Sequence, residues 1–124
     1  MPVTPVLIHE TEAKARLASS LPLWKLDAGR LNRTWRTQNW KATLMAINAI
    51  GHFAEAAWHH PDIHATYSSV SVYLHTHDAG GLTERDFELA SLMETWIGWR
   101  PAPEDSALEG TPGGGPHGYI VRDT

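Results

Sequence analysis

Apolar residues recur at helical and at strand periods along most of the chain. Residues 11–21 are rich in helix formers, and Glu12 and Arg16 are spaced as an i,i+4 ion pair. A proline then ends this helical segment. Residues 23–37 predict two short strands, which the turn-forming residues 27–29 connect.

The segment 38–58 predicts the longest helix of the chain. Pro61 cannot continue a helix, so we expect His59 and His60 at its C-terminal end, where unpaired carbonyls favour a protonated imidazole. Apolar residues three and four positions apart define one broad face for burial: Trp40, Leu44, Ile47, Ile50, Phe53, Ala54 and Ala57.

The pattern becomes that of β-strands from residue 63 to residue 76. One strand is expected to run through Tyr67, and a turn at residues 68–69 would lead into the next. In this second strand, polar and apolar positions alternate, and one set is expected to pack against helices: Val70, Val72, Leu74 and Thr76.

A last helix is predicted after the glycine pair 80–81. Thr83 is a natural N-cap, and Asp86 follows three residues later in the arrangement of a capping box. The buried face of this helix is expected to contain Phe87, Ala90, Met93 (or Leu92) and Trp96.

The element order α-β-β-α-β-β-α predicts a domain of the α+β class over residues 1–99. Its four strands would form an antiparallel sheet with the helices on one face. Residues 100–124 are rich in proline and glycine, so they predict a tail without a core of its own. Residues 119–121 at its end would suit docking on a neighbour, although a disordered terminus is the expected state.

Composition narrows the classes of function. The net charge is −4 and the pI is about 6.0, which together with the lack of a Lys/Arg cluster argues against binding to nucleic acids or to anionic membranes. The chain has no cysteine, so disulfides, thiolate metal sites and cysteine nucleophiles are excluded. It shows neither a signal peptide nor a long apolar run, and we expect a cytoplasmic protein.

Histidines are unusually concentrated in the middle of the chain. The sequence has eight, and such a group of side chains that titrate near neutrality indicates acid/base chemistry or metal binding. Six of them fall between residues 52 and 77: His52, His59, His60, His64, His75 and His77.

The spacing of Glu55, His59-His60-Pro61, Tyr67, His77 and Asp86 resembles the signature of the pterin-4a-carbinolamine dehydratases. The segments HHPD and THDAGGLTERDFELA continue this similarity, which covers about residues 11–97 and is strongest over 54–91. The resemblance implies a hydro-lyase that removes water from 4a-hydroxytetrahydropterin by acid/base chemistry. The pterin would be the substrate, and no cofactor or metal would be needed.

The resemblance also implies a set of site residues. His59, His60, His77 and Asp86 would be catalytic, and either His60 or His77 would donate the proton to the leaving hydroxyl. Asp86 would orient or stabilise a histidine, although taken alone it reads as a helix cap. The implied contacts to the substrate are Glu55, Trp24 and Thr76.

Three features depart from the pattern of that family. Trp58 replaces a small or acidic polar residue, His75 replaces Ser or Thr and would share a strand face with His77, and the tail is long. These departures favour an alternative, a catalytically inactive relative that assists Rubisco assembly in bacteria with α-carboxysomes. A metal site built from histidines 59, 60, 75 and 77 is a third hypothesis. The resemblance further implies a homodimer or a homotetramer.

Overall fold

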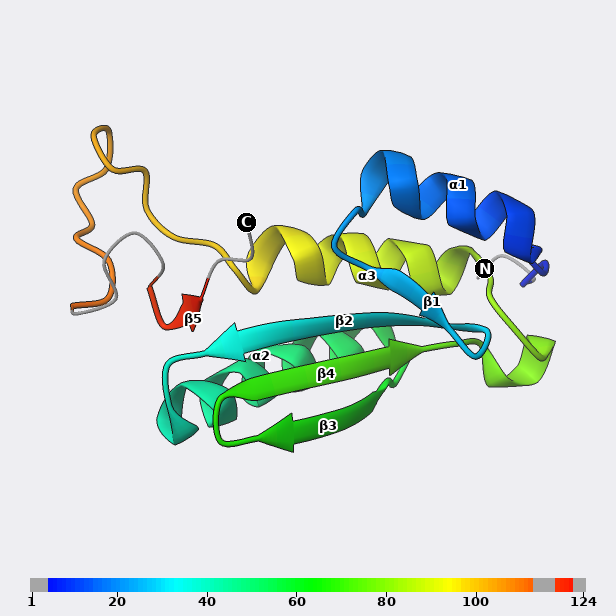
Figure 1. Cartoon of the computed structure of the whole chain (residues 1–124), viewed down its shortest axis with the longest axis horizontal. Coiled ribbons are helices and arrows are strands. Elements are labelled where there is room, and N and C mark those ends of the chain that lie inside the picture. Colours follow the sequence, from blue (N-terminus) through cyan, green and yellow to red (C-terminus); the bar gives the residue numbers. More distant parts are fainter. Residues whose placement is uncertain (1–4, 113–117, 122–124) are drawn as a thin grey trace.

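The computed structural model describes residues 5–112 and 118–121, and it confirms the predicted class and element order (Figure 1). A fifth strand, formed by the tail, adds to the four that the sequence predicts. The elements are α1 (Glu10–Ser20), β1 (Lys25–Asp27), β2 (Arg30–Thr37), α2 (Trp40–Ala57), β3 (Asp62–Thr66), β4 (Ser69–Leu74), the short 3₁₀ helix η1 (His77–Ala79), α3 (Glu84–Trp96) and β5 (Ile120–Val121).

The sheet is antiparallel with the strand order β1-β2-β4-β3, and β5 pairs with β2. Two hairpins build it. The first turns at Ala28 and Gly29, which both have positive φ values of 53° and 79°, as a tight two-residue hairpin requires. The second turns at Tyr67 and Ser68, because Thr66 pairs with Ser69 in the ladder. The predicted turn at residues 68–69 was therefore one residue too late.

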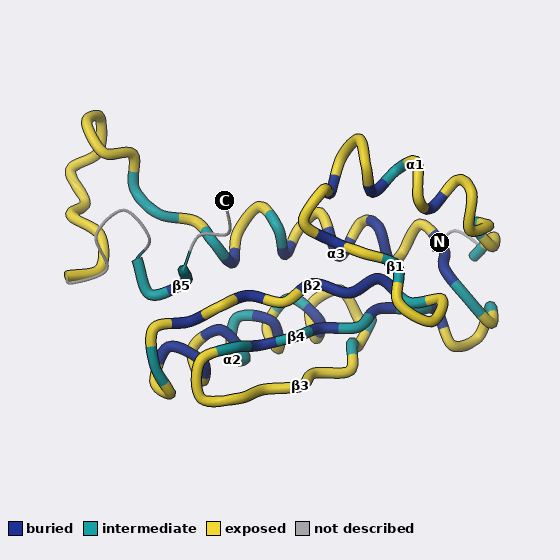
Figure 2. The backbone as a smooth tube through the Cα atoms, viewed as in Figure 1, coloured by how far each residue is buried: buried dark blue, intermediate teal, exposed yellow. Residues whose placement is uncertain are grey.

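One face of the sheet carries the core. Val70, Val72 and Leu74 of β4 are completely buried, as their alternation predicted, and Leu31 and Trp35 of β2 lie in the same cluster. Helices α1, α2 and α3 contribute apolar residues to that cluster. Figure 2 shows the buried positions concentrated along β2, β4 and the inner sides of the helices, whereas β3 is exposed over its whole length.

Helix α2 buries only part of the predicted face, of which Ile50 and Ala54 are buried. Asn39 caps it by accepting a hydrogen bond from the backbone N–H of Ala42 at 2.9 Å. Trp40 and Leu44, which we expected in the core, are 48% and 43% exposed. The residues that face inward are mostly small, which allows the helix to approach the sheet closely: Ala42, Thr43, Ala46, Ile50 and Ala54.

Helix α3 begins at the predicted cap and buries most of the predicted face. Phe87, Ala90 and Met93 are buried, and Leu89 joins them. Trp96 is wrong as a core residue, because its side chain lies at the C-terminal end of the helix and is 52% exposed. Within the described residues, no helix is long and apolar enough to cross a membrane.

The tail returns to the domain. Its strand β5 pairs with the end of β2, where Thr37 lies opposite Ile120, and the backbone N–H of Gln38 donates to the carbonyl of Tyr119 at 3.1 Å. Ile120 is buried in the main core. The expectation of a disordered end was therefore wrong for residues 118–121, while residues 113–117 and 122–124 of the tail lie outside the described residues.

Candidate active site

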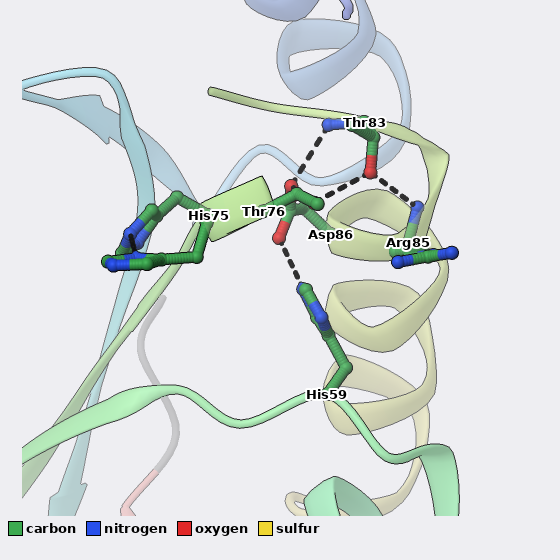
Figure 3. A network of polar contacts seen from close by, with 7 residues as sticks. His59, His75, Thr76, Thr83, Arg85 and Asp86 are labelled. Atoms are coloured by element: carbon green, nitrogen blue, oxygen red, sulfur yellow. Dashed lines mark hydrogen bonds and ion pairs between the residues drawn. The ribbon is translucent and has the colours of Figure 1, made fainter. Parts of the chain in front are cut away.

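Asp86 lies at the centre of the candidate site and is completely buried. One of its oxygens, Oδ2, accepts hydrogen bonds from the backbone N–H of Thr83 at 2.9 Å and from the hydroxyl of Thr76 at 2.8 Å. The other, Oδ1, lies 2.6 Å from Nε2 of His59 (Figure 3). The sequence left a helix cap and a site residue as alternatives for Asp86, and the contacts of its carboxylate are those of both.

Local structure explains why this carboxylate is held in place. Thr83 and Asp86 form the predicted capping box at the N-terminus of α3, where the helix dipole also favours a negative charge. Thr76 follows β4, and its backbone N–H donates to the carbonyl of Gly81 at 2.8 Å. The hydroxyls of Thr76 and Thr83 are 2.7 Å apart. The sequence predicted Thr83 only as a cap, and its spacing to Asp86 was the available signal for its part in the network.

The end of α2 directs the histidine pair. Trp58 caps the helix in the left-handed region with a φ of 53°, a conformation that costs a bulky residue roughly 1 kcal/mol or more. The chain turns there, and His59 points toward α3, where it meets Asp86. The next residue, His60, lies with Nε2 2.9 Å from Oε1 of Glu55, and its ring meets the indole of Trp58 edge to face at 5.0 Å.

His75 and His77 form a second imidazole pair. Nε2 of His75 lies 3.0 Å from Nδ1 of His77, and the ring centroids are 5.2 Å apart. The residue between them, Thr76, has an extended backbone, so the two side chains leave the chain on the same side. This confirms the expectation that both histidines share one face. In Figure 3 His75 lies on one side of Asp86 and Arg85 on the other.

Two cavities adjoin these histidines. One of about 560 Å³ lies between the end of α2 and α3, and His59 and Trp58 line it. The other, of about 800 Å³, has His75 in its wall together with Arg30 and the glycine turn 80–81. Both volumes fall within the range that holds small organic ligands.

Trp24 is the predicted site residue that the structure does not bring to the histidines. It is buried in the core, where it meets Trp35 edge to face at 5.9 Å, and its indole N–H donates to Glu94 at 2.7 Å. The described residues that line its small cavity of about 330 Å³ include no histidine.

The hypothesis of a metal site gains no geometric support. Across residues 5–112 and 118–121, no three His, Asp or Glu side chains are grouped so that they could hold a metal ion. His59 is engaged by Asp86, and His75 and His77 face each other through ring nitrogens. The arrangement is suited to proton transfer, because imidazoles held by fixed partners can donate and accept protons near neutral pH.

Comparisons with known proteins identify the family of the chain. Residues 6–96 match the sequence model of the family "Pterin 4 alpha carbinolamine dehydratase". A protein of Aquifex aeolicus is 41% identical over 73% of this chain and 90% of its own length, and one of Acidobacterium capsulatum is 49% identical over 64% and 86%. Both carry the name "Putative pterin-4-alpha-carbinolamine dehydratase".

A solved structure shows the same fold. The crystal structure of a transcriptional coactivator/pterin dehydratase from Brucella melitensis matches with a TM-score of 0.64 and 27% identity, over 71% of this chain and 95% of that one. The match to the family model covers well over half of the sequence. The chain therefore belongs to the pterin 4 alpha carbinolamine dehydratase family.

Proposed function

We propose that the protein is a hydro-lyase that removes water from 4a-hydroxytetrahydropterin and forms quinonoid dihydropterin. In this reaction the C4a–O bond breaks, a proton joins the leaving hydroxyl to give water, and N5 loses its proton as the C4a=N5 bond forms. The observation that carries the proposal is the position of Asp86. Its carboxylate contacts His59 on one side and Thr76, the neighbour of His77, on the other, so it ties together the two halves of the histidine motif.

The three histidines of the motif differ in exposure: one is largely buried, and two are exposed. The side chain of His59 is only 14% exposed and is bound to Asp86. Its role is therefore to line the substrate site as a polar side chain in a fixed orientation. His60 and His77 are exposed and able to contact a ligand, which suits the donor and the acceptor of the two protons. Glu55 would orient His60 through their 2.9 Å contact.

The proposed contacts to the pterin come from the neighbourhood of the histidine pairs. Glu55 and Thr76 remain in this set because each adjoins a histidine of the motif. Trp24 does not, since its indole is committed to Glu94 and Trp35 inside the core. We therefore assign Trp24 to packing rather than to substrate binding.

Turnover of synthetic 4a-hydroxytetrahydropterin by purified protein tests the proposal. We expect wild type to exceed the uncatalysed rate and His77→Ala and His60→Ala to lose about 100-fold or more, the usual contribution of a positioned acid or base. His64→Ala is the matched control, because His64 lies on the exposed strand β3 with its ring against Tyr73. A wild-type rate equal to the uncatalysed rate would overturn the proposal.

One observation favours a second function, the Rubisco assembly role of dehydratase-like proteins. Trp58 is 75% exposed beside the 560 Å³ cavity, where Leu92 is also partly exposed. An exposed indole next to an apolar groove is typical of a protein-binding surface. Co-expression with an α-carboxysomal Rubisco should then raise the yield of assembled enzyme, and Trp58→Ala should abolish the gain while Trp99→Ala, at a 54% exposed tryptophan, should not.

We also propose that the chain self-associates as a homodimer or homotetramer. Trp40, Leu44 and Met45 leave an apolar stripe exposed on α2, and the edge strand β3 is exposed along its length. Sedimentation equilibrium at micromolar concentration measures the state directly, and a monomer there would contradict the proposal.

A further inference from the structure

The hydrogen bond between His75 and His77 gives His77, one of the two exposed histidines of the motif, a fixed partner. We propose that His75 is a positioning residue that holds His77 with a proton on Nδ1 and leaves Nε2 of His77 directed at the pterin. The inference rests on the proposed dehydratase function and adds a residue to its machinery.

The backbone between the two histidines is unusually well fixed. Thr76 is buried, its hydroxyl donates to Asp86 at 2.8 Å, and its backbone N–H donates to Gly81 at 2.8 Å. The carbonyl of Thr76 accepts from the backbone N–H groups of Ala79 and Gly80, each at 3.1 Å. Because Thr76 is held on all sides, the side chains before and after it leave from set positions. The 3.0 Å contact of the two rings follows from that anchorage.

The direction of the hydrogen bond follows from the chemistry of imidazole. An acid must be protonated before it donates, and a protonated His77 carries a hydrogen on both ring nitrogens. Its Nδ1 can then only donate, so Nε2 of His75 must be the acceptor. If His75 donated instead, the bond would break each time that His77 became charged. The hydrogen bond is therefore kept in both the neutral and the protonated form of His77 only if Nδ1 of His77 carries a proton in each form.

His75 thus does for His77 what Asp86 does for His59: it accepts a hydrogen bond from the ring, but it carries no charge. When His77 gives its Nε2 proton to the leaving hydroxyl, the N–H electron pair stays on Nε2, the C4a–O pair leaves with oxygen, and water departs. His77 becomes neutral and still donates from Nδ1 to His75. A hydrogen bond from a charged donor is the stronger one, so His75 stabilises the imidazolium that must form, without adding a negative charge to the site.

The cavity wall gives His75 a second constraint. Its ring is half-buried and lines the 800 Å³ cavity together with the turn 28–29 and residues 80–82. A fully exposed histidine can exchange its hydrogen-bond partner for water and change its rotamer. A half-buried ring has fewer rotamers available, so it keeps one orientation more of the time. His75 is therefore suited to orienting its exposed neighbour.

Nitrogen-15 NMR of the imidazoles, together with kinetics, tests the inference. In wild type we expect neutral His77 as the Nδ1–H tautomer, and His75→Phe should shift it toward the mixture of a free histidine. His75→Phe should lower kcat by about 10-fold to 100-fold with little change in KM. This loss is smaller than the one expected when the acid His77 itself is removed. His75→Gln places an acceptor oxygen near the position of Nε2 and should keep kcat within about threefold of wild type. His64→Phe and His64→Gln are the matched controls on β3.

The outcomes separate the inference from the proposed function. Absence of wild-type turnover would overturn the dehydratase, while the tautomer of His77 would still be readable. An Nε2–H tautomer in wild type, an unchanged tautomer in His75→Phe, or equal damage by Phe and Gln would overturn the role of His75. If His75→Phe fails to fold, the wild-type spectrum and the Gln variant still decide.

Discussion

Nε2 of His59 lies 2.6 Å from Oδ1 of Asp86, while Oδ2 of the same buried carboxylate caps helix α3. One side chain thus caps a helix and contacts a histidine. A change at Asp86 is therefore expected to affect the stability of the fold and the rate of the reaction together, whereas changes at its partners should separate the two effects.

Asp86→Asn is the first prediction. The amide keeps one acceptor oxygen for Thr83 or His59 but not two, and it places an N–H₂ group where a hydrogen bond was accepted. We expect turnover to fall by about 100-fold, and the free energy of unfolding to fall by about 1–3 kcal/mol for the buried mispaired group. Urea unfolding and steady-state kinetics measure the two losses. Wild-type activity in the folded variant would contradict the role of Asp86.

Thr83→Ala serves to separate the cap from the site. It removes the hydroxyl that accepts from the backbone N–H of Arg85 at 3.2 Å, and loss of a cap costs about 1 kcal/mol. The backbone N–H of Thr83 still donates to Asp86, so His59 keeps its partner. We expect a lower unfolding midpoint in urea and turnover within a few-fold of wild type. A loss of activity as large as that of Asp86→Asn would show that the cap and the site cannot be separated.

Thr76→Val keeps the shape of the side chain and removes its hydroxyl. Asp86 would lose a donor in a fully buried position, and we expect a loss of about 1–3 kcal/mol in the free energy of unfolding. Thr76→Ser retains the hydroxyl and should lose less than half as much. Equal losses in the two variants, measured by urea unfolding, would mean that packing rather than the hydrogen bond matters at this position.

The tail strand should contribute measurably to stability. Ile120→Ala deletes a side chain that is 5% exposed and packed in the main core, and we expect the lower end of the range for buried isoleucines, about 2 kcal/mol, because β5 has only two residues. Amide exchange at Gln38 should accelerate, since its N–H donates to Tyr119. Leu108→Ala, at a leucine that is 62% exposed in the same tail, should change stability by less than about 0.5 kcal/mol.

The contact between α1 and α3 should depend on pH. Arg16 donates two hydrogen bonds to Glu84, at 2.5 and 2.9 Å, and these bonds lower the pKa of the Glu84 carboxyl. A carboxyl whose folded pKa is lowered stabilises the fold above its unfolded pKa of about 4.3, and the contribution is lost as pH falls through the folded pKa. Because Glu84 is largely exposed, we expect only about 0.5 kcal/mol near neutral pH.

A double-mutant cycle of Arg16→Gln and Glu84→Gln isolates this pair from the helix dipole, which Glu84 also meets in the first turn of α3. The coupling energy from thermal unfolding should be positive near pH 7 and should decrease as the pH falls below about 4.3, the pKa of an unfolded glutamate. A coupling that persists at the lower pH would show that the two side chains interact through packing instead of charge.

The strands could be predicted from the sequence because polar and apolar residues alternate along them, and only one of the two sets of side chains can face the core. Val70, Val72 and Leu74 are buried for that reason. Helix α2 was harder, since it carries apolar residues on more than one side. Periodicity correctly included Ile50 and Ala54 in the buried face, but it also included the exposed Trp40 and Leu44 and left out the buried Ala42 and Ala46. The face of α2 that packs against the sheet depends on the distance between the helix and the sheet. The local sequence of the helix does not determine that distance.

The sequence proposed the members of the candidate site but not how their side chains pair. The motif spacing proposed His59, His60, His77 and Asp86 as site residues, and strand geometry correctly placed His75 beside His77. The pairing of His59 with Asp86 joins elements 27 residues apart, and it depends on how α2 and α3 pack. The strand β5 was missed because two apolar residues after a glycine-rich stretch are too short a signal for a strand.

The return of β5 to the sheet has a consequence for insertions and deletions. The connection from α3 to residue 118 contains no α-helix or β-strand within its described part, residues 97–112, and it crosses from one end of α3 to the end of β2. Each doubling of such a loop costs only about 0.6 kcal/mol, so its length is nearly free to change. We expect close homologues that share the tail to differ in the number of residues in this connection, while an apolar residue is kept opposite Thr37.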